Sequence, residues 1–221
     1  FPDDVKKVQE ALNRFPPPPH VIRFAPLRPS PMQSPSPLAR ALFLDRDGVL
    51  NQERSYVHRV EDFILFPGTG PALHRLLAAG FQLFVVTNQS GIGRGYYTLA
   101  DMHRVHAHME AELARDGVRF TRIYFAAEAP EQPSRGRKPS PQHLFDARDE
   151  FGVDLGASYM IGDKLIDLQC GWNAGVKASL LVRTGYGAEV ERKAPPELSR
   201  AVVVDNLPAA ADWILGAAAG R

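Results

Sequence analysis

Residues 41–48 read Ala-Leu-Phe-Leu-Asp-Arg-Asp-Gly, an apolar run that ends in two closely spaced carboxylates. Four consecutive apolar residues of this kind are typical of a strand that is buried on both faces of a sheet. Two similar runs end in Thr87-Asn88-Gln89-Ser90 and in Gly162-Asp163-Lys164. Because ligands of an open parallel sheet bind beyond the carboxyl ends of its strands, we expect these three polar clusters to meet at one edge.

Apolar runs and amphipathic stretches alternate along the rest of the chain. The expected strands are 41–44, 81–86, 123–125, 159–161, 180–182 and 202–204, and the expected helices are 70–79, 98–116, 140–150, 165–173 and 208–215. Thr98 followed by Asp101 resembles a capping box, and Gly80 suits a helix C-cap. This order predicts an α/β fold, a Rossmann-like three-layer sandwich with a central parallel sheet and a minimal cap.

The first 40 residues differ in composition from the rest of the chain. They hold ten of its 19 prolines, including the run 16–19. Proline fixes φ and lacks an N–H donor, so this stretch is typical of an extended linker. Its first dozen residues could form a short helix capped by Asp3. We therefore divide the chain into an N-terminal extension, residues 1–40, and a folded domain, residues 41–221. The sequence leaves the partner of the extension open.

Net charge and cysteine content argue against several classes of protein. A formal net charge of +1 indicates no broad basic surface for nucleic acid, and no apolar run approaches the length of a membrane span. The single cysteine, Cys170, excludes an internal disulfide and any multi-cysteine metal site. We expect a monomer in the reducing cytoplasm, with no nucleic-acid or membrane partner.

The carboxylates at the expected sheet edge indicate a metal site. Asp45 and Asp47 are two residues apart, so in an extended chain both side chains lie on the same face and repel each other. Asp163 arrives from a distant strand as a third oxygen ligand, which suits Mg²⁺ together with a substrate phosphate. Lys138 and Lys164 supply the positive charge that a phosphate site requires. Any one Asp after a strand is as readily a helix cap, so the joint pattern carries this interpretation.

Four segments stand in the order of the four motifs of the haloacid dehalogenase (HAD) superfamily. They are Asp45-x-Asp47-Gly48, Thr87-Asn88, Lys138-Pro139 and Gly162-Asp163-x-x-x-Asp167. Within that superfamily, Tyr56-Val57-His58 and Arg137-Lys138-Pro139 resemble the D-glycero-D-manno-heptose 1,7-bisphosphate phosphatases most closely, and the histidinol-phosphate phosphatases next. The resemblance covers residues 41–190, and its motifs are specific in combination.

This resemblance implies a Mg²⁺-dependent phosphatase that hydrolyses a small sugar phosphate. Asp45 would be the nucleophile, Asp47 the general acid and base, and Thr87 and Lys138 would bind the transferring phosphoryl group. Asp45, the main-chain carbonyl of Asp47, and Asp163 would hold the metal. The implied substrate-binding residues are Glu53, Arg54, Ser55, Tyr56, Asn88, Gln89, Ser90, Arg137 and Lys164, although only Tyr56 of residues 53–56 matches the family pattern.

The chain departs from the family at a loop that usually binds zinc through Cys and His ligands. The corresponding positions are Ala126, Glu128, Ser134 and Gly136, so every ligand is missing and we expect no structural zinc. The loss puts the identity of the substrate in doubt, because the loop shapes the substrate pocket. We expect Glu128 or Glu131 to hold the loop by pairing with Arg135 or Arg137.

Two other groups of reactive side chains have simpler interpretations. His103, His106 and His108 follow a helical pattern without a neighbouring carboxylate cluster, which favours solvated helix surface over a metal site. No motif surrounds Cys170, so we interpret it as a small packed residue.

The residues leave the substrate open. Histidinol phosphate, another small sugar phosphate, or a nucleic-acid 3′-phosphate would use the same mechanism, although the near-neutral net charge weakens the last. A non-catalytic phosphate-binding module is a further alternative. Asp47 argues against it, because an acid and base beside the nucleophile favours turnover.

Overall fold

The computed structural model describes residues 38–218, which contain a six-stranded sheet. Its strands are β1 (Arg40–Leu44), β2 (Phe81–Asn88), β3 (Arg122–Ala126), β4 (Tyr159–Gly162), β5 (Ala178–Val182) and β6 (Val202–Val204). All neighbouring pairs run parallel, in the order β3-β2-β1-β4-β5-β6. The six predicted strands are therefore confirmed, with ends that differ by no more than two residues.

Helices follow most of the strands. They are α2 (Thr69–Ala78), α3 (Ser90–Gly93), α4 (Leu99–Ala114), α5 (Gln142–Phe151), α6 (Leu165–Ala174), α7 (Gly187–Lys193) and α8 (Leu207–Ala218). Short 3-10 helices cover Val60–Asp62, Leu155–Ala157 and Pro196–Arg200. The five predicted helices are confirmed, and the helix expected in the first dozen residues lies outside the described residues.

Two helix ends test the predicted caps. The capping box of α4 is present: the Thr98 side chain accepts from Asp101 N–H, and the Asp101 carboxylate accepts from Thr98 N–H. Gly80 was wrong as the cap of α2, because the helix ends at Ala78 and Ala79 is the C-cap residue. Gly80 follows with φ 86° and donates its N–H to Leu77 O, which is the role of the left-handed residue just beyond a cap.

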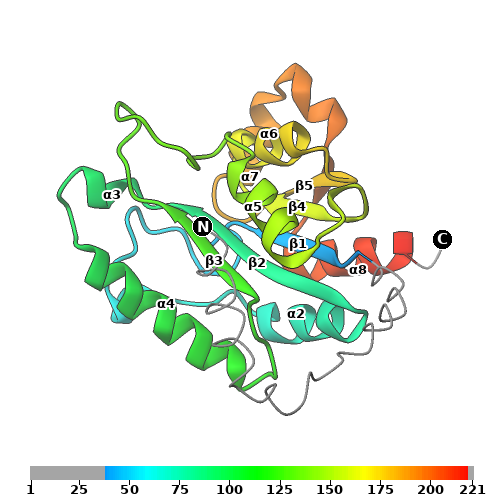
Figure 1. Cartoon of the computed structure of the whole chain (residues 1–221), viewed down its shortest axis with the longest axis horizontal. Helices are drawn as coiled ribbons and strands as arrows, with labels where there is room; N and C mark the ends of the chain where they lie inside the picture. Colours follow the sequence, from blue (N-terminus) through cyan, green and yellow to red (C-terminus); the bar gives the residue numbers. More distant parts are fainter. Residues whose placement is uncertain (1–37, 219–221) are drawn as a thin grey trace, which may run out of the picture. The chain divides into compact units, whose positions relative to one another are not determined.

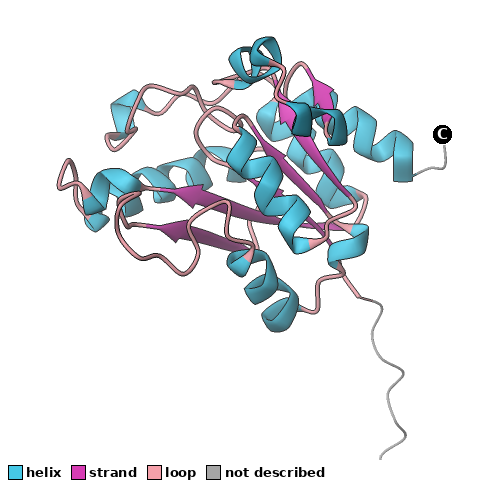
Figure 2. Cartoon of the chain, turned by 90° about the horizontal axis from the view of Figure 1, so that it is seen from above, coloured by secondary structure: helices cyan, strands magenta, loops and turns pink. Residues whose placement is uncertain are grey.

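Side chains of β1 alternate between two apolar layers. Leu42 and Leu44 belong to a core with α2, α4 and α8, whereas Ala41 and Phe43 belong to a second core with α5 and α6. All four side chains are fully buried, as expected for a strand between two layers of helices. Helices accordingly lie on both faces of the sheet (Figures 1 and 2). The predicted three-layer α/β sandwich is confirmed.

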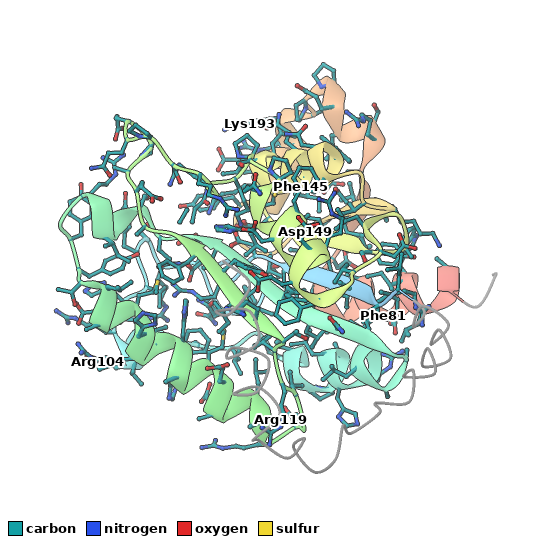
Figure 3. The ribbon with its side chains drawn as sticks, viewed as in Figure 1. Phe81, Arg104, Arg119, Phe145, Asp149 and Lys193 are labelled. Atoms are coloured by element: carbon teal, nitrogen blue, oxygen red, sulfur yellow. The ribbon has the colours of Figure 1, made fainter. Side chains whose placement is uncertain are left out.

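Aromatic residues of β2 and α5 belong to the same two apolar layers. Phe81, labelled at the start of β2 in Figure 3, is buried in the first core, with the Arg40 guanidinium 4.4 Å from its ring centre. Phe145, labelled on α5, packs against the second core. Arg104 pairs with Asp101 on the exposed side of α4.

The strand order places the chemistry-bearing loops together. From the central β1 the chain adds β2 and β3 on one side, and later β4, β5 and β6 on the other. The switch point therefore lies between β1 and β4, whose carboxyl ends carry Asp45 and Asp163. Between β1 and α2 the chain forms only loops and a 3-10 helix, which agrees with the minimal cap. Among residues 38–218, no helix is long and apolar enough to cross a bilayer.

Candidate active site

Lys138 links two carboxylates at the carboxyl edge of the sheet. Its Nζ lies 2.8 Å from Asp45 Oδ1 and 2.7 Å from Asp167 Oδ1. The side chains of Lys138 and Asp167 are 1% exposed and that of Asp45 is 7% exposed. Burial raises the pKa of Asp45 to about 6, although the charge of Lys138 partly offsets that effect. Asp45 is therefore a buried carboxylate with a buried cation beside it.

Asp163 completes a cluster of three carboxylates. One oxygen from each of Asp45, Asp163 and Asp167 lies within 4.8 Å of the others. Asp163 Oδ2 accepts from Tyr186 N at 2.9 Å, whereas its buried Oδ1 has no hydrogen-bond partner. Burial, followed by the charges of Asp167 and Asp45, raises the pKa of Asp163. Three clustered oxygen ligands and an orphaned buried oxygen fit a hard divalent cation such as Mg²⁺.

Two glycines allow the backbone to approach Asp163. A Cβ atom added to Gly48 or to Gly185 would overlap Asp163 Oδ2, and both residues have positive φ, 88° and 57°. Thr184 ties the two loops together, because its Oγ1 donates to Gly48 O at 2.6 Å. These close approaches require glycine at both positions, and they form a cradle around the carboxylate.

Asp47 lies in a ring of hydrogen-bond donors. Arg46 donates from Nε and Nη2 at 2.7–3.1 Å, Asn51 Nδ2 donates at 3.0 Å, and Gln89 Nε2 donates at 3.2 Å. Burial favours a higher pKa for Asp47, but the Arg46 guanidinium and the hydrogen bonds hold its pKa below the ordinary value. The carboxylate is therefore oriented from several sides while its side chain remains 15% exposed.

The end of β2 positions Thr87 and Asn88 beside the loop that carries Lys138. Gln89 Nε2 donates to Thr87 Oγ1 at 2.9 Å, and Tyr97 Oη donates to Gln89 Oε1 at 2.7 Å. Asn88 Oδ1 accepts from Lys138 N at 3.0 Å, and its Nδ2 donates to Lys138 O at 3.2 Å. Asn88 thus holds the Lys138 backbone as well as lining the site.

These groups open into a pocket of about 390 Å³. Its lining residues are Asp45, Asp47, Glu53, Ser55, Tyr56, Thr87, Asn88, Gln89, Ser90, Tyr97, Arg137, Lys138, Lys164, Ile166, Asp167 and Tyr186. Among the residues singled out from the sequence, Asp163 lies behind this lining, and Arg54 lies outside it. Arg54 is exposed, and its Nη2 lies 3.4 Å from the neighbouring Gln52 Oε1.

Lys164 joins the loop of residues 53–56 to the carboxylate cluster. Its Nζ lies 3.2 Å from Glu53 Oε2, 3.9 Å from Asp163 Oδ1 and 4.6 Å from the ring centre of Tyr186. Tyr56 packs edge-on against Tyr96 at the rim. One side of the pocket is therefore cationic and aromatic, and it faces the carboxylates at the base.

Sequence analysis missed several residues of the site. Asp167 belongs to the quoted fourth motif, so its spacing from Asp163 was the available signal. Arg46 lies between Asp45 and Asp47 in the sequence and is fully buried, whereas a charged residue in a loop is usually expected to be exposed to solvent. Tyr97 and Tyr186 stand in loops with no recognisable motif.

The loop between β3 and α5 is held by contacts other than those predicted. Glu128 accepts from Ser134 Oγ, and Glu131 pairs with Arg94 at 3.3 Å. Arg135 pairs with Asp146 of α5, and Arg137 Nη1 donates to Glu128 O at 3.2 Å. The predicted pairing of Glu128 or Glu131 with Arg135 or Arg137 was wrong, because partners from α5 and from the segment after α3 lie closer.

The histidines of α4 do not share one environment. His106 is 4% exposed, so its assignment to solvated helix surface was wrong. Burial lowers its pKa from 6.5 to about 3. Cys170 is buried as expected, and burial raises the pKa of its thiol to about 12.

Comparisons with known proteins agree with this geometry. Residues 136–210 match a family described as HAD-hydrolase-like. The chain is 42% identical over 150 residues to D-glycero-alpha-D-manno-heptose-1,7-bisphosphate 7-phosphatase of Burkholderia mallei, covering 65% of this chain and 79% of that protein. It is 39% identical over 186 residues to the D-glycero-beta-D-manno-heptose-1,7-bisphosphate 7-phosphatase of Escherichia coli K12, covering 81% and 90%.

A solved structure extends the likeness to three dimensions. The D,D-heptose 1,7-bisphosphate phosphatase of B. bronchiseptica, complexed with magnesium and phosphate, has a TM-score of 0.74 and 33% identity. The match covers 80% of this chain and 99% of that one. With the motif residues gathered at one sheet edge and relatives of this similarity, the chain belongs to the heptose 1,7-bisphosphate phosphatase family of HAD-like phosphatases.

Proposed function

We propose that this phosphatase hydrolyses the 7-phosphate of D-glycero-D-manno-heptose 1,7-bisphosphate through an aspartyl-phosphate on Asp45. The observation that carries the proposal is the lining of one pocket by Asp45, Asp47 and Lys138, with Lys138 Nζ 2.8 Å from Asp45 Oδ1. The names of the relatives support the substrate. They differ in the anomer, alpha in one and beta in the other, and the proposal covers both.

Asp45 is the proposed nucleophile. In the first step its carboxylate oxygen forms a bond to phosphorus as the bond to the sugar oxygen breaks, and in the second step water displaces the phosphoryl group from Asp45. Lys138 and Thr87 face the same pocket as Asp45 and would bind the phosphoryl oxygens. The buried ammonium of Lys138 also holds Asp45 in one orientation.

Asp47 is the proposed general acid and base. It would donate a proton to the departing sugar oxygen and then accept one from the attacking water. Its ring of donors, Arg46, Asn51 and Gln89, would keep the carboxylate aimed into the pocket between the two steps. The role needs Asp47 to be oriented before the substrate arrives, and these contacts provide that orientation.

The metal site follows from the same cluster. Asp45, Asp163 and the main-chain carbonyl of Asp47 would hold Mg²⁺, with Asp167 beside them. When bound, Mg²⁺ supplies positive charge that offsets the negative charge of the transferring phosphoryl group. The raised pKa of Asp163 and its orphaned Oδ1 support a cation at this position.

The remaining pocket residues would contact the rest of the sugar phosphate. Arg137 and Lys164 bring positive charge that suits a second phosphate, and Glu53, Ser55, Tyr56, Asn88, Gln89 and Ser90 complete the proposed substrate-binding set. Arg54, which lies outside the lining of the pocket, stays in that set as a prediction. A histidinol-phosphate or other small phosphate ester would require less charge on this side of the pocket.

The proposal extends to the organisation of the chain. We place the start of the catalytic domain near residue 41, one residue after β1 begins at Arg40, and treat the residues before β1 as an extension outside it. We propose a monomer without structural zinc that works in the cytoplasm, and the single cysteine, which is buried and free, supports a reducing compartment. Removal of residues 1–37 should leave kcat unchanged, and a large loss would contradict this division.

Steady-state kinetics on a panel of phosphorylated metabolites test the proposed substrate. We expect kcat/KM for the heptose bisphosphate to exceed that for p-nitrophenyl phosphate by at least about 100-fold. A ratio near one would reject the substrate assignment. Asp45→Asn should abolish turnover in a folded protein, since the amide keeps the shape but cannot attack phosphorus. Ordinary turnover by that variant would reject the covalent route.

A further inference from the structure

The loop between β3 and α5 carries Arg137 and Lys138 into the pocket without a helix or strand of its own. The family's zinc ligands correspond here to Ala126, Glu128, Ser134 and Gly136. These positions offer no thiolate and no imidazole, so they do not fit a closed zinc site. Among the described residues, the one group of His, Cys, Asp or Glu close enough to share an ion is the Asp45, Asp163 and Asp167 cluster.

Two of the four positions bind each other. Ser134 Oγ donates to Glu128 Oε2 at 2.8 Å and accepts from Arg137 N at 3.1 Å. The main-chain carbonyl of Glu128 accepts from Arg137 Nη1 at 3.2 Å. Arg137 is therefore held at both its backbone and its guanidinium by the same pair of loop residues.

A third position is filled by an imidazole from α5. A Cβ atom added to Gly136 would overlap Nε2 of His143, so His143 occupies the space that a side chain at residue 136 needs. The His143 ring stacks on Tyr124 of β3, with 5.1 Å between ring centres and 18° between planes. The fourth position, Ala126, is buried at the end of β3. The four positions that correspond to the family's zinc ligands are therefore packed or hydrogen-bonded within this chain.

We propose that Glu128, Ser134 and His143 form a metal-free anchor that positions Arg137 for substrate binding. Ser134 and Glu128 fix the two ends of Arg137, and His143 holds the loop against β3 next to it. Ser134 and His143 are positioning residues, since neither lines the pocket. The role of Arg137 rests on the proposed function, whereas the anchor itself can be tested without a substrate.

Thermal unfolding and metal analysis test the anchor. Gly136→Ala should lower Tm by several degrees, and the double variant with His143→Ala should lose less than the sum of the two single losses, because His143→Ala removes the overlapping ring. The backbone at Gly136 does not have a positive φ, so the substitution tests the overlap alone. Gly216→Ala, where a Cβ meets no atom within 4 Å, is the control. Equal Tm for the two Ala variants, or stoichiometric zinc in the purified full chain, would overturn the anchor.

Kinetics test the positioning of Arg137. Ser134→Ala should raise KM for the heptose bisphosphate about tenfold and leave kcat nearly unchanged, since it loosens a binding group. Ser134→Thr keeps the hydroxyl and should restore KM, and Glu131→Ala, which removes only an exposed ion pair, is the control. Adding Ser134→Ala to Arg137→Ala should cause no further rise in KM for the heptose bisphosphate.

The two proposals can fail separately. The positioning role would be overturned if KM for the heptose bisphosphate were a further tenfold higher in the Ser134→Ala and Arg137→Ala double variant than in Arg137→Ala. It would also be overturned if Ser134→Ala raised KM for p-nitrophenyl phosphate equally. Absence of heptose bisphosphatase activity in the wild type, together with the expected Tm pattern, would instead reject the proposed substrate and leave the anchor intact.

Discussion

The Nζ atom of Lys138 lies 2.7 Å from Oδ1 of Asp167, and both side chains are 1% exposed. A buried ammonium needs a partner, since leaving a charge unpaired inside a protein costs several kcal/mol. Lys138 has two such partners, and only Asp45 among them lies on the proposed route of phosphoryl transfer. In the proposed mechanism Asp167 would therefore keep Lys138 in place while Asp45 carries the phosphoryl group.

Asp167→Asn should weaken both the lysine contact and the carboxylate cluster. We expect the Mg²⁺ concentration for half-maximal activity to rise roughly 10–100-fold, which is the usual cost of losing a partner of a metal site. The measurement is initial rate against free Mg²⁺. Asp149→Asn, which removes an exposed carboxylate of α5, is the matched control. An unchanged Mg²⁺ requirement in Asp167→Asn would show that Asp167 only packs beneath the site.

Asp47→Asn should slow the enzyme in a manner that depends on the leaving group. An amide cannot donate the proton that a departing sugar alkoxide needs, so we expect kcat to fall roughly 10²–10⁴-fold with the sugar phosphate. The p-nitrophenolate ion leaves without a proton, so the loss with p-nitrophenyl phosphate should be much smaller. Equal losses with both substrates would contradict the role of Asp47 as the acid.

The fold was predictable because its signals are local. Each strand is a short run of apolar residues. A strand that is buried on both faces accommodates few other types of residue. Helix α7 was missed because its sequence, Gly-Ala-Glu-Val-Glu-Arg-Lys, lacks an apolar stripe. It forms where Gly187 packs closely against the backbone at Val182, a contact that periodicity does not report.

The sequence predicts those site residues whose chemical type allows only a few roles. Asp45, Asp47 and Asp163 follow strands whose ends must meet, so the topology brings them together. The direction of each side chain in the loop of residues 53–56 could not be predicted, because the turn at Ser55 and Tyr56 has positive φ at both residues. The partners of Glu128 and Arg135 were wrong because long side chains reach many alternatives.

Removal of the metal should abolish activity and lower stability. The three clustered carboxylates repel one another, and Lys138 contacts only Asp45 and Asp167, so Mg²⁺ should bind the folded state preferentially. At a Mg²⁺ concentration 100 times the Kd we expect about 2.7 kcal/mol of added stability, measured by urea unfolding with Mg²⁺ or with a chelator. Asp163→Asn should lose most of this increment. Full activity after exhaustive chelation would contradict the site.

Arg46→Met should destabilise the protein by about 3–5 kcal/mol, because Arg46 is fully buried and its removal leaves the carboxylate of Asp47 without a countercharge. The double variant with Asp47→Asn should lose less than the sum of the two single losses. Arg148→Met is the control, because it breaks an exposed pair with Asp149 and should cost no more than about 1 kcal/mol. Additive losses at Arg46 and Asp47 would show that the pair is not coupled.

The final prediction concerns the pH dependence of stability at His106. The chain places His106 four residues after Met102 and three before Met109, both fully buried, so it lies on the inner side of α4. Burial is the main cause of its lowered pKa, the nearby charge of Arg46 and the neighbouring His103 lower it further, and Asp47 acts in the opposite direction. The folded protein therefore keeps His106 neutral under conditions in which the unfolded chain protonates it.

The sign of the effect follows from proton uptake. The folded pKa is about 3 and the ordinary value is 6.5, so between these values the unfolded state binds the extra proton and stability falls as pH falls. At pH 5 the loss attributable to His106 should be about 2 kcal/mol relative to pH 7 or above. Urea unfolding of wild type and His106→Gln at pH 7.5, 6 and 5 gives the free energy of unfolding of each protein as a function of pH. The difference between the two curves measures the loss due to His106, because the other titrating groups contribute equally to both. His108→Gln, on the same helix with a side chain 32% exposed, is the control and should follow the wild type. Parallel curves for wild type and His106→Gln would show that His106 becomes protonated in the folded state, and that its burial does not set the acid limit of this domain.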